Sequence, residues 1–155
     1  MTNLNSNKNF NDIFLLEALR ILRSSENKIA RKIIYEAYLD YKKSNNFDIF
    51  KISTIKKCAD LVKGDLDEIG FLVEFNYLNK DHFLALYSDV VRRVWISLEE
   101  EILCERKLRK NSSFQDNKKV DIFLKYFESL AQHAKKYREE KDLSEPTFID
   151  FRNLD

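Results

Sequence analysis

Apolar residues recur at intervals of three and four along most of the chain, which is the spacing of an amphipathic α-helix. The clearest run passes from Val120 through Phe123, Phe127 and Leu130 to Tyr137. Polar clusters separate this run from four others. The pattern therefore predicts five helices, over about residues 11–23, 26–44, 54–74, 81–110 and 120–140.

Polar residues with short side chains stand where several of these helices should begin. The first helix can start at Asn11 or Asp12, and the second can be capped by Ser24 or Ser25. Such side chains accept hydrogen bonds from backbone N–H groups that have no partner within the first turn. For the fourth helix the predicted N-cap is Asn79 or Asp81.

The third predicted helix contains both glycines of the chain, Gly64 and Gly70. A glycine costs about 1 kcal/mol relative to alanine in a helix interior. Two explanations fit that cost: a break or kink near Gly64, or a close helix crossing at Gly70. Just before this helix, the alternation of apolar and polar residues over 47–52 fits a short extended stretch, which by itself makes no sheet.

Turn-forming residues are scarce, because the 155 residues include only two glycines and one proline. An all-β fold needs such residues every few positions, whereas helices joined by polar loops do not. We therefore predict an all-α fold, a bundle of four or five main helices that run mostly antiparallel. The expected organisation is a disordered lead over residues 1–10, a single helical domain over 11–143, and a tail over 144–155 that either docks on the bundle or stays loose.

Charged side chains are numerous but balanced, with 27 Lys and Arg against 26 Asp and Glu. No part of the chain has the basic excess that attracts a protein to nucleic-acid phosphates or to an anionic membrane. No stretch approaches the roughly 18 consecutive apolar residues of a membrane span. The polar N-terminus also lacks the pattern of a signal peptide. We therefore expect a cytoplasmic protein without a membrane span.

Histidines and cysteines, which often carry catalysis or bind metals, are few and isolated. The only histidines, His82 and His133, have no glutamate three residues before them and no arginine four to six residues before them, so they fit neither a di-metal nor a helical nuclease motif. The two cysteines, Cys58 and Cys104, are far apart and are expected to be small core residues. The sequence predicts no catalytic, metal or cofactor site and indicates no small-molecule ligand.

One polar group lies within the most apolar part of the fourth predicted helix. Arg92 and Arg93 are flanked by Val90-Val91 and Val94-Trp95, so one of them should lie at the edge of the core. A buried guanidinium needs a carboxylate partner to offset its desolvation. The expected result is a structural ion-pair cluster with one of three glutamates that are each flanked by apolar stripe residues: Glu36, Glu68 and Glu128.

A series of short motifs runs through residues 28–138. They are Ala30-Arg31-Lys32, Tyr35-Glu36, Asp67-x-Ile69-Gly70, the set Trp95, Leu98, Ile102 and Arg106, and Phe127-Glu128 with Leu130-Ala131. In this order they resemble an uncharacterised prokaryotic family of small all-helical proteins, a domain of unknown function that often follows an N-terminal membrane helix not found here. The family tends to have Gly at Asn76 and often Pro at Glu100. The resemblance implies the helix count and scaffold roles, without an activity, for Arg31, Tyr35, Trp95 and Arg106.

Three classes of function remain open. The lack of a catalytic set and the aromatic content of 13% favour a non-catalytic helical module that binds another protein or a second copy of itself. A nucleic-acid-binding or regulatory domain is the second alternative. An enzyme is the third, and it would need a pocket that gathers either arginine with tyrosine and carboxylate side chains. An exposed apolar patch would strengthen the first interpretation, whereas burial of four aromatics within one chain would weaken it: Phe47, Phe50, Phe148 and Phe151.

Overall fold

The computed structural model describes the backbone of residues 3–112 and 123–148. Over these residues the chain forms five α-helices, one 3-10 helix and no strand, which confirms the all-α prediction. In chain order the elements are α1 (Asn3–Arg23), α2 (Ser25–Ser44), η1 (Phe47–Lys51), α3 (Ser53–Glu74), α4 (Lys80–Ser112) and α6 (Lys125–Glu140).

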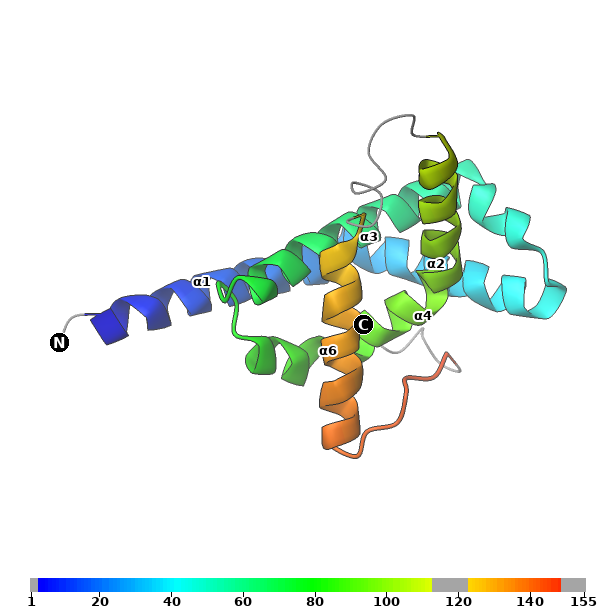
Figure 1. Ribbon diagram of the computed structural model, residues 1–155. Coiled ribbons are helices and arrows are strands. Elements are labelled where there is room, and N and C mark those ends of the chain that lie inside the picture. The colour runs from blue at the N-terminus through cyan, green and yellow to red at the C-terminus, as the bar shows by residue number, and fades with distance from the viewer. Residues whose placement is uncertain (1–2, 113–122, 149–155) are drawn as a thin grey trace.

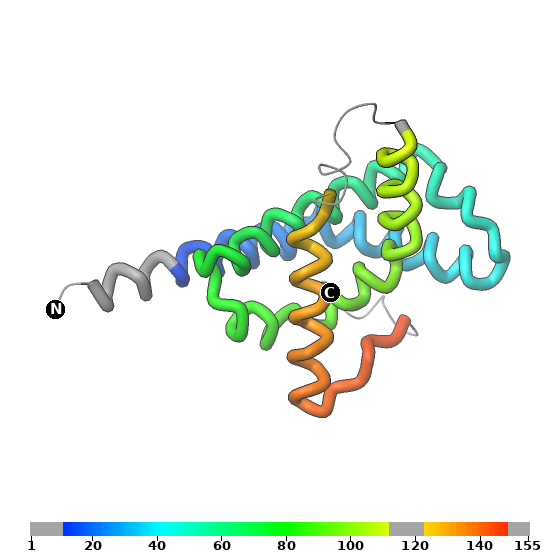
Figure 2. Tube along the Cα trace, in the orientation of Figure 1, coloured from blue at the N-terminus to red at the C-terminus, as the bar shows by residue number. Residues whose placement is uncertain are grey.

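The helices fold back on one another and α6 lies across them (Figure 1). α2 follows α1 after the single residue Ser24, whose hydroxyl accepts a hydrogen bond from the Asn27 N–H and so confirms the predicted N-cap. α3 returns beside α1 and α2, and α6 crosses α3 and α4 at a steep angle and contacts both. The trace in Figure 2 follows the same path, with α6 lying across α3 and α4.

The long helix α4 changes direction along its length (Figure 1). Within it, the hydroxyl of Ser97 donates to the carbonyl oxygen of Arg93 at 2.7 Å. A serine that binds the carbonyl four residues earlier is associated with bent helices. The later part of α4, from Glu101 to Leu108, faces η1 and the beginning of α3.

The structure corrects the predicted beginning of the first helix. α1 begins at Asn3 rather than at Asn11 or Asp12, so a helix occupies most of the predicted disordered lead. Ala18 and Leu22 of this helix are fully buried. Once packing has formed the turns that contain them, each residue added upstream gains one backbone hydrogen bond, and the helix extends at little cost.

The segment before α3 is a 3-10 helix, not the extended stretch that its alternation suggested. The side chain of Asn46 accepts a hydrogen bond from the Asp48 N–H at 3.1 Å, and this local bond starts the turn. Phe50 is thereby directed into the core, and its ring lies 5.5 Å from that of half-buried Phe47. Side-chain capping therefore decides the conformation of this segment.

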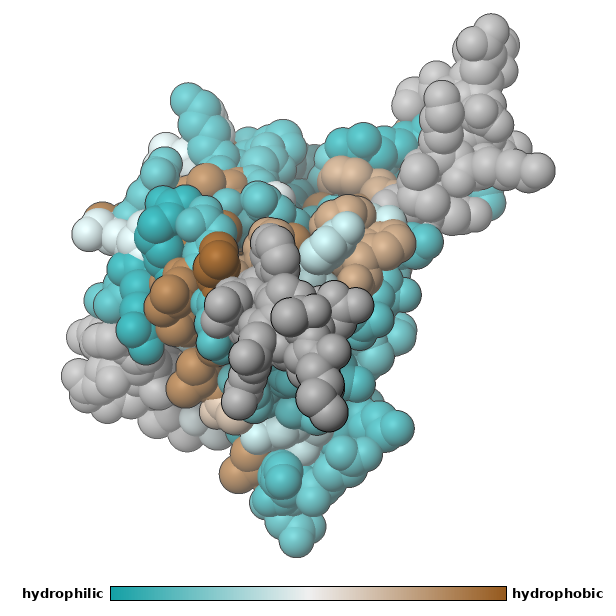
Figure 3. Space-filling model, turned by 90° about the vertical axis from the view of Figure 1, so that its left-hand side faces the viewer, coloured by the Kyte–Doolittle hydropathy of each residue, from teal (hydrophilic) through white to brown (hydrophobic). Residues whose placement is uncertain are grey.

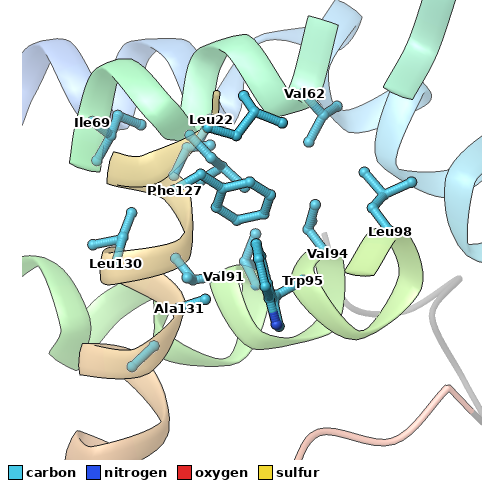
Figure 4. Packing of buried hydrophobic residues seen from close by; sticks show 14 of the residues in the cluster. Leu22, Val62, Ile69, Val91, Val94, Trp95, Leu98, Phe127, Leu130 and Ala131 are labelled. Atoms are coloured by element: carbon cyan, nitrogen blue, oxygen red, sulfur yellow. The ribbon is translucent and has the colours of Figure 1, made fainter. Parts of the chain in front are cut away.

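The core lies where α6 meets α3 and α4 (Figure 4). The ring of Phe127 is fully buried, and Trp95 meets it edge-on at 5.2 Å between ring centroids. The burial of Trp95 confirms its predicted place on the apolar stripe. Ile29, which the pattern of the second helix placed on a stripe, is exposed instead. The residues labelled around the two rings come from α1, α3, α4 and α6, and all but Ala131 lie on predicted stripes: Leu22, Val62, Ile69, Val91, Val94, Leu98, Leu130 and Ala131.

The close helix crossing predicted at Gly70 is confirmed. A Cβ atom on Gly70 would lie 2.3 Å from the carbonyl oxygen of Tyr126, so only glycine lets α3 and α6 approach this closely. Gly64 is exposed, and a Cβ there would meet nothing within 4 Å. Because α3 continues through Gly64, the alternative of a helix break there is wrong.

α6 begins at Lys125 rather than near Val120, which lies outside the described residues. Leu124 has a left-handed backbone with φ of 57°, and its side chain forms no cap. The Asp67 carboxylate on α3 instead accepts a hydrogen bond from the Phe127 N–H at 2.9 Å. The beginning of α6 thus depends on a side chain from another helix, which the local pattern cannot reveal.

The described part of the predicted tail docks on the bundle. Glu145 pairs with Arg92, and the ring of Phe148 lies 4.9 Å from that of Tyr38 on α2. Residues 149–155, including Phe151, lie outside the described residues. Docking is therefore the outcome for residues 144–148.

Candidate interaction surface

The turn between α3 and α4 carries aromatic side chains that lie against one another. The rings of Phe71 and Phe75 are 4.7 Å apart, and Tyr126 of α6 lies 5.4 and 6.1 Å from them. Tyr77 connects Phe71 to Phe14 of α1, with ring distances of 6.5 and 5.5 Å. We call this group the aromatic surface, and its residues are Phe14, Phe71, Phe75, Tyr77 and Tyr126.

Much of the aromatic surface is open to solvent. Phe75 is 52% exposed, Tyr77 48% and Phe71 39%. Ile13 and Leu16, on the same helix as Phe14, are also exposed. Figure 3 shows apolar side chains gathered on this end of the molecule. Exposed apolar residues are ordinary when they are single, but contiguous ones often mark an interaction site.

Backbone hydrogen bonds fix the turn that presents these rings. Asn76 has a left-handed φ of 59° directly after the end of α3. Its N–H donates to the Val73 carbonyl at 3.1 Å, and the Tyr77 N–H donates to the Leu72 carbonyl at 2.9 Å. This pair of bonds is the Schellman arrangement, in which glycine or asparagine tolerates the left-handed position. Asn76 therefore occupies the left-handed position just after the C-cap of α3.

Arg92 and Arg93 both lie at the edge of the core, with side chains 11% and 5% exposed. Their partners differ from the predicted glutamates. The Arg92 Nε and Nη2 atoms lie 3.1 Å from carboxylate oxygens of Glu145. Arg93 donates to the Thr147 carbonyl at 3.2 Å and lies 3.8 Å from the carboxylate of Asp89.

The predicted cluster with Glu36, Glu68 and Glu128 does not assemble. Glu36 and Glu68 are exposed on α2 and α3, and Glu128 pairs with Arg106 at 2.8 Å. Periodicity shows that a charged residue borders an apolar row, but it does not show which rows meet. The segment that supplies Glu145 was predicted only as a tail, so the partner of Arg92 could not be found from the pattern.

The residues expected to be scaffold positions are part of the packed interior. Arg31 is buried and donates to the Leu22 carbonyl at 2.9 Å, which joins α2 to the end of α1. Tyr35 is buried, and the Arg93 guanidinium lies 5.7 Å from its ring centroid. Arg106 donates to the carbonyl of Phe123, just before α6, at 2.8 and 3.1 Å. Together with Trp95, these positions hold the helices to one another.

A buried lysine that the sequence pattern did not single out joins α3 to α4. Lys63 is 2% exposed, and its ammonium lies 3.1 Å from Asp60, 2.9 Å from Glu101 and 3.1 Å from Glu105. Glu105 also pairs with Arg109 at 2.9 Å. The sequence offers one indication, because Lys63 immediately follows Val62 on the apolar stripe of α3, a place similar to that of the two arginines on α4.

The groups around Lys63 keep one another ionised. Burial alone would lower the pKa of Lys63, but Glu101 and Glu105 raise it above its ordinary value. Burial alone would raise the pKa of Glu105, but hydrogen bonds and charge from Arg109 and Lys63 lower it. The Lys63 ammonium therefore stays protonated, and this site connects helices rather than supplying a nucleophilic amine.

A surface cavity of about 450 Å³ lies beside Arg93. Its lining includes Tyr137, Asp89 and Glu145, the residue types that the enzyme alternative required. The guanidinium groups next to it are engaged, because Arg92 binds Glu145 and Arg93 binds Asp89 and a tail carbonyl. The docked tail also forms part of the cavity wall, from Leu143 to Thr147.

A second cavity, of about 350 Å³, lies between η1, the beginning of α3 and the later part of α4. Cys104 is half-buried in its wall rather than packed in the core as predicted. Cys58 is half-buried at the edge of the core, where burial raises the pKa of its thiol. Both cysteines are free thiols at the margin of the fold.

The two histidines lie on different helices, His82 exposed in the first turn of α4 and His133 on α6. The backbone N–H of His82 donates to the Asn79 side chain at 2.9 Å, which confirms Asn79 as the N-cap of α4. His133 is half-buried on α6, where burial and the charge of Lys80 lower its pKa. Within residues 3–112 and 123–148, no three His, Cys, Asp or Glu side chains form a group that could hold a metal ion.

The motifs behind the family resemblance lie on the helices that build the core, and the resemblance itself stays a prediction. Among the helices of the described residues, none has the length and apolar character needed to cross a membrane. No family model, no curated protein and no solved structure matches the chain.

Proposed function

We propose that the protein is a non-catalytic helical interaction module that binds a protein partner through the aromatic surface. The observation that carries this proposal is the exposure of Phe71, Phe75 and Tyr77 within one group of contacting rings. Aromatic side chains are enriched at protein interfaces because they bury a large area with few rotatable bonds. A partner that covers these rings would remove them from water together.

The rings are held in place before any partner arrives. Asn76 fixes the turn, and the contact of Gly70 with the Tyr126 backbone fixes α6 against α3. Binding to a preformed surface loses less conformational entropy than binding to a mobile one. This rigidity supports a recognition role for the aromatic surface.

Other aromatic residues of the chain serve the interior. Phe50 is buried, and Phe47 and Phe148 are half-buried. Their burial accounts for part of the aromatic content that first favoured an interaction module. The proposal therefore rests on the aromatic surface and not on composition.

The rim of the aromatic surface carries charges of both signs. The Lys125 ammonium lies 5.3 Å from the centroid of the Tyr126 ring. Glu74 accepts a hydrogen bond from the Ser129 hydroxyl at 3.4 Å on the α3 side. A partner with an apolar centre and a mixed polar border fits this arrangement.

The nucleic-acid alternative has less support. Several basic side chains that could face phosphates have carboxylate partners, among them Lys42 with Glu100 at 3.2 Å and Lys56 with Asp60 at 3.2 Å. The enzyme alternative was tied to a pocket at Arg92 or Arg93, and the Arg93 guanidinium is engaged within the chain. We propose neither function.

The test compares two variants with equally exposed apolar residues. Phe75→Ser removes a ring from the aromatic surface, and Leu86→Ser removes a side chain outside it; both native residues are 52% exposed. The wild type and both variants would be used as immobilised baits, with bound proteins quantified by mass spectrometry. Light scattering over a range of concentrations would show self-association.

We expect the wild type and Leu86→Ser to retain the same partner, or to self-associate equally, and Phe75→Ser to lose at least about tenfold of that binding, because central aromatic residues dominate interface energies. Circular dichroism would verify that both variants fold. Binding that survives in Phe75→Ser and in a second variant, Tyr77→Ser, would show that the aromatic surface is not the interface.

A further inference from the structure

The segment after α6 leaves the helix and lies on the bundle. Asp142 has a left-handed φ of 54°, and the Leu143 N–H donates to the Arg138 carbonyl at 2.8 Å. From Leu143 to Thr147 the backbone has no regular secondary structure. We call residues 143–148 the docked segment; its sequence is Leu-Ser-Glu-Pro-Thr-Phe.

Three arginines from two helices bind the docked segment. Arg138 of α6 donates to the Ser144 carbonyl at 2.6 and 3.0 Å. Arg92 of α4 binds the Glu145 carboxylate through Nε and Nη2. Arg93 of α4 donates to the Thr147 carbonyl at 3.2 Å. Two of these contacts recognise the backbone, and one recognises a carboxylate.

An aromatic contact ends the docked segment. The ring of Phe148 lies 4.9 Å from that of Tyr38 and meets the Tyr35 ring edge-on at 5.8 Å. Both tyrosines belong to α2, so the segment crosses from α6 over α4 to α2. The segment therefore presents a carboxylate and, three residues later, an aromatic ring to fixed positions on three helices.

The receiving side chains are positioned by the helices themselves. Arg93 pairs with Asp89 one turn earlier on α4, and Arg92 also donates to the Ala131 carbonyl of α6 at 3.4 Å. Arg138 additionally donates to the Ser88 hydroxyl at 3.3 Å. Extended peptides are commonly bound in this way, through backbone carbonyls for affinity and a few side chains for specificity. The arginines thus have the properties of a peptide-binding groove.

We propose that the groove formed by Arg92, Arg93 and Arg138 is a peptide-binding site that the docked segment occupies in competition with a partner. The partner is a protein that presents an extended stretch with a glutamate followed, three residues later, by an aromatic residue. The Glu145 carboxylate shows the charge that the groove selects, and the Phe148 ring shows the anchor. This site is separate from the aromatic surface and stands whether or not that surface binds a protein.

Tethering explains why the docked segment would fill the groove in the free protein. A short tether gives the segment an effective concentration on the order of millimolar, which a partner has to exceed. The wild type should therefore bind an added peptide weakly. A change that weakens the docked segment should strengthen binding of a peptide from outside.

The experiment uses the full chain and a fluorescein-labelled peptide of residues 142–148, Asp-Leu-Ser-Glu-Pro-Thr-Phe. Fluorescence anisotropy would compare the wild type with the Glu145→Gln and Phe148→Ala variants, whose own segments compete less well. We expect at least about tenfold tighter peptide binding by the variants than by the wild type. A peptide with glutamine in place of its glutamate should bind more weakly to each of them.

A groove variant supplies the matching control. Adding Arg92→Gln to the Glu145→Gln chain removes the guanidinium that receives the peptide glutamate, and should abolish the gain in affinity. Circular dichroism would establish that each variant is folded. No saturable binding to folded Glu145→Gln and Phe148→Ala chains, or binding that is indifferent to both the peptide glutamate and Arg92, would overturn the proposal.

Discussion

Asparagine and aspartate take the left-handed positions at three helix ends of this chain. Asn45 is the C-cap of α2, and Asn76 and Asp142 each follow the C-cap residue of α3 and α6. All three have φ between 53° and 59°. Neither glycine of the chain has positive φ. Because short polar side chains tolerate this conformation better than most others, the scarcity of glycine does not prevent sharp helix ends.

We predict that Asn76→Val lowers the free energy of unfolding by about 1–2 kcal/mol, since a β-branched residue is strained in the left-handed region. Asn76→Gly at the same exposed position should be neutral or stabilising. Urea titration followed by circular dichroism would measure both. Equal stability of the two variants would show that the Asn76 conformation does not limit the turn.

Trp95 gives a second prediction at the scale of one residue. Its side chain is buried against Phe127, so Trp95→Ala should leave a cavity and cost about 3–5 kcal/mol of unfolding free energy. Leu86→Ala, a truncation on the same helix at an exposed position, should cost much less. Denaturant titration by circular dichroism would compare them, and a loss below about 1 kcal/mol for Trp95→Ala would contradict its role in the core.

The crossing of α3 and α6 is the contact between elements that the sequence specifies most directly. A glycine in a helix interior is unfavourable unless something needs its missing side chain. At Gly70 that need is the Tyr126 backbone, and at Gly64 nothing requires it. The two glycines of one helix therefore have opposite consequences.

We predict opposite effects for the two alanine substitutions in α3. Gly64→Ala should stabilise the protein by up to about 1 kcal/mol, because alanine favours the helix and its Cβ meets no neighbour. Gly70→Ala should destabilise it by about 1–3 kcal/mol, because α6 has to move away. Thermal and urea unfolding of the matched pair would test this, and destabilisation by both substitutions would contradict the interpretation of Gly64.

The helices could be predicted from apolar spacing more reliably than their ends. The rows through Val62 and Phe127 follow the helical period, and their described members are buried or half-buried. The beginning of α6 instead depends on Asp67, which is distant in sequence, and η1 depends on a local hydrogen bond that the Asp48 N–H donates to the Asn46 side chain. Periodicity reports which face is apolar, but it does not report such individual hydrogen bonds.

The candidate sites were less predictable than the fold for the same reason. The positions of Arg92 and Arg93 at the core edge follow from the pattern of α4, but their partners come from the docked segment and from α4 itself. Apart from Phe14, the residues of the aromatic surface lie outside the apolar rows that the spacing picked out, and nothing in the pattern indicates that they meet. Contacts between distant segments decide both sites.

The ion pairs of Lys63 with Asp60, Glu101 and Glu105 make the stability of the whole molecule depend on pH. A carboxyl group whose pKa is lowered by folding stabilises the folded protein at pH values above its ordinary pKa. That stabilisation is lost as the pH falls through the lowered pKa of the folded state. The pKa values of Glu105 and Asp60 are lowered by Lys63 and by Arg109 or Lys56, against the effect of burial. Acid should therefore weaken the connection between α3 and α4 below about pH 4, near the ordinary carboxyl pKa values.

We predict that Lys63→Met costs about 3 kcal/mol at pH 7, because it leaves Glu101 and Glu105 without their shared partner in a largely buried place. The difference from the wild type should shrink as the pH is lowered toward 3, since protonated carboxyl groups no longer need the ammonium. Lys56→Met removes an exposed lysine from the same surroundings and should cost less than about 1 kcal/mol. Urea midpoints measured at several pH values would test this, and a pH-independent cost would contradict it.

The dependence of α6 on residues from other helices has a consequence for the order of folding. Its first turn is held by Asp67 of α3, and Phe123, two residues before the helix, is held by Arg106 of α4. Both restraints act on α6 only once α3 and α4 are in place beside it. A helix with its own N-cap, by contrast, can nucleate independently. During refolding, amide protons of α3 should therefore become protected from exchange before those of α6, and the last step of folding should be the arrival of α6 on a preformed pair.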